Sequence, residues 1–285
     1  MLDPSPSWIS IALLGTALIL LALDRFRSRA TLPPSLRYLV ALFGLLALAD
    51  WLSFSIAIWI MAFFAFLALR EYFSLLDLRM EDRWGILGAY LAIPFMVYFI
   101  FIDWYGLFII SIPVYVFLVI PFLAALGGGD GKGIVYSIGA IDFGLFLFVY
   151  CMGHLGYLAF FSVRMTLLLV MAVALCDLLC RWLPLRHPLP RFLTGVLLVT
   201  GGAWLLSPWT GIPRLHSAAL GILIPFLVQA GHFTLRAIEA DLGVRPEALE
   251  PGRGRVLDSL KAYLFTAPII FHYLRWFLGW GDIAP

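Results

Sequence analysis

The sequence predicts an all-α fold, a polytopic membrane helix bundle of about ten transmembrane spans. Its 285 residues are 63% hydrophobic and only 13% charged, and the mean hydropathy is +0.99. A soluble domain carries about 25% charged and about 45–50% apolar residues. A water-soluble fold of this size could not bury so much apolar surface. We therefore expect residues 1–285 to form a single integral membrane domain, buried in lipid and against neighbouring helices.

Apolar stretches predict each span in turn. A simple crossing needs about 20 apolar residues. Several stretches are shorter, so the pair 38–51 and 55–69 is also compatible with a re-entrant hairpin. The stretch 134–161 is long enough to be tilted or broken. The ten predicted spans are 8–23, 38–51, 55–69, 85–102, 104–126, 134–161, 165–180, 192–206, 216–230 and 260–280.

Basic residues orient the predicted bundle. If the N-terminus lies outside, all of the 19 Lys and Arg except Arg164, Arg214 and Arg275 fall in cytoplasmic connections. Cytoplasmic loops carry the excess of Lys and Arg in membrane proteins. We therefore expect a multi-pass protein of the plasma (inner) membrane with both termini outside the cytoplasm. The net charge of +2 is too small to indicate a nucleic-acid partner.

Three polar positions within or beside the spans are candidates for chemistry. Asp177 lies at the cytoplasmic end of an apolar run, where an acid is costly unless it is paired, solvated or bound to a cation. Arg181, one turn later, offers such a pair, and a functional site is the alternative. The third span ends with Arg70-Glu71-Tyr72. This segment is either an anchor at the membrane interface or a contact with a lipid phosphate. His154 is either a structural contact or part of a site.

The longest polar stretch, 231–259, is expected to be a cytoplasmic loop between the last two spans. Its glycines permit turns and close approach to a ligand. Its arginines can pair with phosphate oxygens, because planar guanidinium matches phosphate geometry. A basic loop leaning on anionic headgroups is the alternative. The candidate substrate-binding residues, here and after the seventh span, are Arg181, Arg186, Gly243, Arg245, Gly252, Arg253, Gly254 and Arg255.

This stretch resembles the signature of the phosphatidate cytidylyltransferase (CDP-diacylglycerol synthase) family, GD-x-x-ES-x-x-KR-x-x-G-[IV]-KD followed by PGHGG-x-LDR-x-D. Asp177 falls on the acid of the family's S-D-x-x-A-Y segment, and the likeness extends from about 38 to 280. The matching positions near the signature are Gly231, Gly243, Val244, Pro251, Gly252, Gly254, Leu257, Asp258 and Pro268. The resemblance implies a cytidylyltransferase-like fold, a homodimer, CTP and a lipid phosphate as substrates, and Mg²⁺.

Several charged residues of the signature are replaced. His232 and Lys261 stand where the family has Asp, and Glu239 stands where it has Lys. The other departures are Leu235, Arg236, Ala240, Pro246, Arg253, Arg255 and Ser259. Of the acids on motif positions only Asp177 and Asp258 remain. They are the candidate catalytic residues and the candidate metal ligands, although Mg²⁺ prefers a fuller octahedral set of oxygens.

These observations leave three functions open, and whether the protein is an enzyme stays undecided. A degenerate paralogue in phospholipid biosynthesis, a pseudoenzyme, would bind phosphatidate or another lipid phosphate without a cofactor; arginines in place of acids favour it. An active nucleotidyltransferase with a rebuilt site would need Mg²⁺, and Asp177, Asp258 and the glycines favour it. A lipid transporter or flippase-like protein is favoured only by prolines and polar residues inside spans. The expected partners are membrane lipids and a second copy of the chain.

Overall fold

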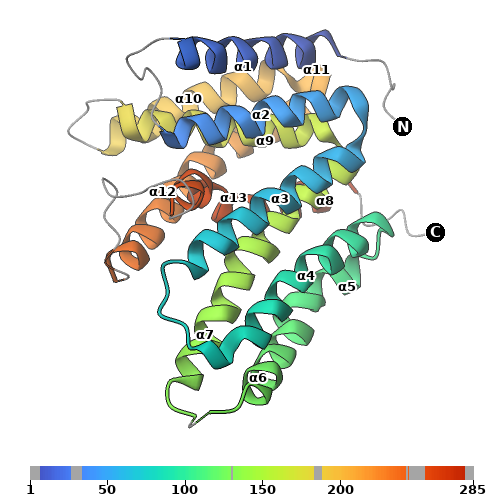
Figure 1. The fold of residues 1–285 in the computed structure, drawn as a ribbon. Helices are drawn as coiled ribbons and strands as arrows, with labels where there is room; N and C mark the ends of the chain where they lie inside the picture. Colours follow the sequence, from blue (N-terminus) through green and yellow to red (C-terminus); the bar gives the residue numbers. More distant parts are fainter. Residues whose placement is uncertain are drawn as a thin grey trace.

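The computed structural model describes residues 7–26, 34–129, 131–182, 188–241, 243 and 254–279. Within these ranges the chain is built of helices (Figure 1). Each predicted span coincides with a helix or with a run of consecutive helices. The first four are α1 (Trp8–Phe26), α2 (Pro34–Leu52), α3 (Phe54–Phe73) and α4 (Arg83–Phe101), the last preceded by the 3-10 turn η1 (Met80–Asp82).

The next two predicted spans are helices interrupted by π-helical turns. The first runs through α5 (Tyr105–Ile110), η2 (Ser111–Val116) and α6 (Phe117–Leu126). Pro113 lies inside η2, where its missing N–H removes a hydrogen bond from the helical ladder. The second runs through α7 (Ile134–Gly144), η3 (Leu145–Cys151) and α8 (Met152–Phe161). The stretch 134–161, expected to be tilted or broken, is thus one continuous helical run with a π-helical middle.

The last helices differ most from the prediction. They are α9 (Val163–Trp182), α10 (Pro188–Leu205), the short α11 (Ser207–Thr210), α12 (Arg214–Asp241) and α13 (Arg255–Phe277). α12 continues past 230 because its buried residues Gly231, His232, Leu235 and Glu239 recur at helical spacing and turn one polar face inward. The predicted loop 231–259 is corrected accordingly, since helix occupies both of its ends.

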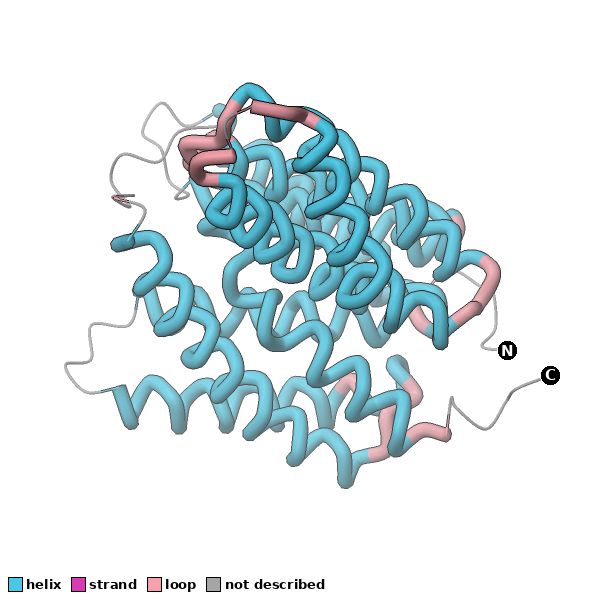
Figure 2. Tube along the Cα trace, turned by 90° about the horizontal axis from the view of Figure 1, so that it is seen from below, coloured by secondary structure: helices cyan, strands magenta, loops and turns pink. Residues whose placement is uncertain are grey.

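Five helical runs in the described part are long and apolar enough to cross a membrane: Phe54–Phe73, Met80–Phe101, Tyr105–Leu126, Ile134–Phe161 and Arg214–Asp241. The protein is therefore a membrane protein, while ten crossings and their orientation stay a prediction. In Figure 1 the α2–α3, α4–α5 and α8–α9 connections lie at one end of the bundle and the α6–α7 connection at the other. Figure 2 shows the loops gathered at the helix ends.

α13 is the central helix of the bundle. It packs against α2, α3, α8, α9, α12 and η3. Its side chains from 256 to 264 are buried on every face, and the fully buried Tyr263 donates its hydroxyl to the carbonyl oxygen of Val170 in α9 at 3.1 Å. A helix that is surrounded in this way brings its polar residues into contact with several elements at once.

Candidate functional site

The beginning of α13 is capped by a side chain from α3. Gly254, the residue before the helix, has φ +88°, a conformation that favours glycine. The backbone N–H groups of Val256 and Leu257 donate to Oε2 of Glu71 at 2.7 and 3.2 Å. The first N–H groups of a helix have no partner within the helix and carry partial positive charge, so a carboxylate there is stabilising. Glu71 is 2% exposed, and it therefore joins two helices instead of anchoring the chain at the membrane surface.

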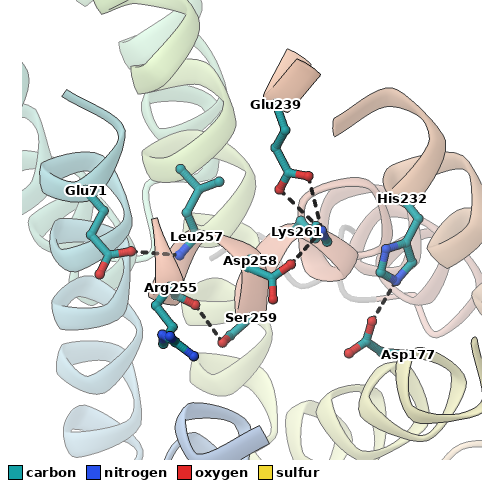
Figure 3. Close-up of polar contacts among 9 residues, drawn as sticks. All are labelled: Glu71, Asp177, His232, Glu239, Arg255, Leu257, Asp258, Ser259 and Lys261. Atoms are coloured by element: carbon teal, nitrogen blue, oxygen red, sulfur yellow. Dashed lines mark hydrogen bonds and ion pairs between the residues drawn. The ribbon is translucent and has the colours of Figure 1, made fainter. Parts of the chain in front are cut away.

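A buried ion-pair network follows one turn into α13 (Figure 3). The ammonium of Lys261 lies 2.6 Å from Oδ1 of Asp258 and 3.2 Å from Oε1 of Glu239, which comes from α12. All three residues are less than a tenth exposed. Removing an ion from water costs on the order of several kcal/mol unless a partner compensates its charge. The three side chains therefore depend on one another.

The second motif acid is paired across two other helices. Oδ1 of Asp177 in α9 lies 2.6 Å from Nε2 of His232 in α12, and both residues are buried. The two groups are close enough for an ion pair, although their relative orientation falls short of hydrogen-bond geometry. The other ring nitrogen of His232, Nδ1, is buried and has no hydrogen-bond partner among the described residues. The predicted pairing with Arg181 is not described, because that side chain lies outside the described residues.

A glycine brings α12 and α13 together at this level. A Cβ atom on Gly231 would lie 3.2 Å from the carbonyl oxygen of Lys261, closer than most side chains come to a neighbouring atom. The two helices therefore approach closely where His232 and Lys261 stand. Glu239 follows His232 by two turns of α12 and shares its buried face. Gly231, which matches the family signature, thus has a packing role here.

The structure brings together some of the predicted site residues. Asp177 and Asp258 are both buried and both are linked to α12, Asp177 by its contact with His232 and Asp258 through Lys261, which contacts Glu239. Gly254 precedes α13, and the partly buried Arg255 is its first residue. Gly243 follows α12 with φ +66°. The remaining predicted positions, Arg186, Arg245, Gly252 and Arg253, lie outside the described residues.

The sequence prediction missed two acidic members of the site. Glu71 was assigned to the membrane interface, and Glu239 was noted only as a departure from the family pattern. The signal for Glu239 was present, because the resemblance implies Lys at 239 and Asp at 261 and both signs are reversed here. These two positions pair in the structure at 3.2 Å. In this chain the acid of the pair is on α12 and the base on α13, the reverse of the charges that the resemblance implies.

The residues present do not fit the Mg²⁺ that the family resemblance implies. Within the described residues no group of three or more His, Cys, Asp or Glu side chains is arranged to hold a metal ion. The space that a cation would take beside Asp258 is filled by the ammonium of Lys261, and that beside Asp177 by the imidazole of His232. A divalent cation would meet like-charge repulsion from Lys261.

Comparisons with known proteins support the resemblance in part. No family model matches the chain, and no solved structure matches it. The uncharacterized protein YnbB of Escherichia coli (strain K12) is 26% identical over 239 residues, which cover 75% of this chain and 78% of YnbB. A phosphatidate cytidylyltransferase of Synechocystis sp. is 37% identical over 84 residues, covering 29% of this chain and 26% of that enzyme. The second likeness thus spans about a quarter of each protein.

Proposed function

We propose that the protein is a degenerate relative of the phosphatidate cytidylyltransferases that binds a lipid phosphate, such as phosphatidate, and does not transfer cytidylate. The observation that carries this proposal is the pairing of both remaining motif acids. Asp177 lies 2.6 Å from His232, and Asp258 lies 2.6 Å from Lys261. Cytidylate transfer in the resembled family relies on a metal to neutralise phosphate charge, and these acids already have side-chain partners.

The same cluster holds a buried ring nitrogen, Nδ1 of His232, that has no hydrogen-bond partner among the described residues. When this atom carries a proton, it presents an N–H group. A phosphate oxygen is an acceptor for such a group, and hydrogen bonds to charged partners are the stronger ones. The buried pair of Glu239 and Lys261 leaves these two positions with opposite charges, which is compatible with a site that still holds polar groups.

The alternative function is an active cytidylyltransferase on phosphatidate or another lipid phosphate. It is supported by the retained Asp177, Asp258 and Gly254, and by the likeness over 84 residues to an enzyme of that name. This alternative requires the pairs with His232 and Lys261 to open, so that both carboxylates become available to a metal.

The experiment that separates the two functions uses the purified full chain with labelled CTP, phosphatidate and Mg²⁺. We expect no CDP-diacylglycerol. Native mass spectrometry should detect bound phosphatidate in preference to phosphatidylcholine. The Arg253→Ala/Arg255→Ala variant should weaken that binding about tenfold, because a charge-assisted hydrogen bond contributes about 1.5–3 kcal/mol. Arg83→Ala, at the exposed start of α4, is the matched control and should bind normally.

Two results would contradict the proposal. CDP-diacylglycerol formation that is abolished by Asp177→Asn and by Asp258→Asn would establish the transferase. Equal affinity for phosphatidate and phosphatidylcholine, unchanged in the double arginine variant, would mean that the segment with Arg253 and Arg255 only contacts lipid headgroups without selecting among them.

A second experiment tests the incompatibility with metal. The variant His232→Asp/Glu239→Lys/Lys261→Asp restores the charges that the family signature has at these positions. We expect millimolar Mg²⁺ to raise its melting temperature and to leave the wild-type protein unchanged. Glu239→Lys/Lys261→Asp, with His232 intact, is the control that separates metal binding from repair of the ion pair. Stabilisation of the wild-type protein by Mg²⁺ would show that its acids hold metal as they stand.

A further inference from the structure

An open cavity is lined by residues that neighbour two charged residues of the site in sequence. Its volume is about 560 Å³, and it lies between the end of α3, one face of α7 and the end of α12. Binding pockets for small ligands commonly enclose about 300–1,000 Å³. The residues that define its walls include Tyr72, Tyr136, Gly139, Ala140, Phe143 and Ile238.

The cavity is apolar and open at its side. Val135 and Phe143, both on α7, are 81% and 40% exposed. Tyr72 is buried, and its hydroxyl is already used as a donor to the carbonyl oxygen of Ala140 at 3.1 Å. The wall at Tyr72 therefore offers mainly apolar contact, while Asp241 supplies a carboxylate at the α12 wall.

The cavity lies at one end of three helical runs that are apolar enough to cross a membrane. Its three walls come from runs that are long and apolar enough to cross a membrane, Phe54–Phe73, Ile134–Phe161 and Arg214–Asp241. An apolar opening in such a region faces acyl chains, and apolar surface is expelled from water. The cavity is also adjacent in sequence to the charged site. Tyr72 follows Glu71, which caps α13, and Ile238 precedes Glu239, which pairs with Lys261.

We propose that this cavity holds one acyl chain of a membrane phospholipid whose headgroup lies at the neighbouring charged residues. The headgroup part of the inference rests on the proposed function. The chain part rests on the shape and the apolar walls of the cavity and on the helical runs that form it. The occupant is an acyl chain because the exposed apolar side chains at the opening stand on α7, which belongs to a run long and apolar enough to cross a membrane.

The test places the full chain in lipid nanodiscs that contain phosphatidate with a diazirine near the end of one acyl chain. A second set of nanodiscs contains phosphatidylcholine with the same chain. After illumination, mass spectrometry should find labelled peptides from α7 and the end of α12. Gly139→Trp should reduce that labelling about tenfold, equivalent to about 1.4 kcal/mol, because the indole fills the space.

A matched glycine makes the substitution interpretable. A Cβ atom on Gly139 meets nothing within 4 Å, and the same holds for Gly106 on α5, which does not line the cavity. Gly106→Trp should therefore keep full labelling. If Gly139→Trp lowers the melting temperature of the protein, Ala237→Phe closes the cavity from the opposite wall and should give the same loss.

The outcomes distinguish this inference from the proposed function. Equal labelling of α7 and α12 by both lipids, lost in Gly139→Trp, would support the acyl-chain cavity and contradict preference for a lipid phosphate. If the labelling is as strong in Gly139→Trp and Ala237→Phe as in the wild-type protein, or if it falls on other helices, the cavity is not an acyl-chain site.

Discussion

Two polar clusters stand at opposite ends of α13; the first is buried and the second only partly so, and their polar groups are compensated in different ways. The first, at the start of the helix, is the charge cluster. The second, at its end, is the aromatic cluster, in which rings surround the polar groups. The charge cluster consists of Glu71, Asp177, His232, Glu239, Asp258 and Lys261. The aromatic cluster consists of Asp103, Tyr105, His154, Tyr157, His272 and Arg275.

The aromatic cluster relies on hydroxyls and ring faces. Tyr157 donates to Oδ1 of Asp103 at 2.6 Å, and the Tyr105 hydroxyl lies 3.1 Å from Nδ1 of His272. The guanidinium of Arg275 stands 3.6 Å from the centre of the Tyr105 ring, a cation–π contact. His154 is fully buried, with Nδ1 at 2.8 Å from the carbonyl oxygen of its own helix at residue 150. Its contacts favour the structural role over a site.

This contrast indicates how each cluster responds to loss of a member. A carboxylate whose cation is removed stays charged in a region that excludes water, and the whole desolvation cost falls on the folded state. A hydroxyl removed from among aromatic rings leaves most of the packing in place, because the rings keep their contacts. The charge cluster should therefore be much the more sensitive of the two.

The largest effect is expected for Lys261→Met. This change leaves Asp258 and Glu239 facing each other in a buried layer without their shared cation. Breaking a buried ion pair by removing one partner costs about 3–5 kcal/mol. Unfolding by SDS titration in mixed micelles should report a loss of this size.

The control removes all three charges together. Glu239→Gln/Asp258→Asn/Lys261→Met should recover most of the lost stability, because no uncompensated charge remains. A triple variant as unstable as Lys261→Met would mean that packing of the lysine stem, and not charge, sets the cost.

An intermediate effect is expected for Glu71→Ala. The N–H groups of Val256 and Leu257 then lose the carboxylate that accepts from both. Loss of a helix N-cap costs about 0.5–2 kcal/mol, and we expect the upper end because the cap is buried. Glu71→Gln keeps an acceptor oxygen and should lose only part of this. Hydrogen exchange at the first turn of α13 measures the effect locally, and an unchanged rate in Glu71→Ala would contradict the capping role.

The smallest effect is expected in the aromatic cluster, for Tyr157→Phe. The ring stays packed, and only the hydrogen bond to Asp103 is lost. We expect a cost of about 0.5–1.5 kcal/mol. Tyr115→Phe, on a side chain that is 51% exposed, should cost nothing measurable. A loss for Tyr157→Phe as large as that for Lys261→Met would erase the proposed difference between the clusters.

The sequence predicted the helices well because apolar composition dictates them locally. The long stretch 134–161 is one helical run with a π-helical segment at η3, where its length had left tilt or a break open. The end of α12 was harder, because His232 and Glu239 look like loop residues when their partners are unknown. In the fold they point inward, toward Asp177 and Lys261.

The candidate site was predictable only in part, because its pairs join residues that are far apart in the chain. Asp258 and Lys261 are three positions apart, and helical spacing brings such residues together. Lys261 and Glu239 lie 22 positions apart on different helices, and no periodicity connects them. Glu71 and Val256 are 185 positions apart, so only the packing of α3 against α13 could reveal their contact.

The long-range cap on α13 has a consequence for how the chain is made. Glu71 leaves the ribosome well before Val256, the donor it meets 185 positions later. Until α13 forms and packs against α3, the carboxylate of Glu71 lacks the helix end that compensates it, although Glu71 is almost fully buried in the folded molecule. A chain that stops before residue 255 would thus carry an acid whose intended partner never arrives. Membrane quality control could recognise such a product by this one feature.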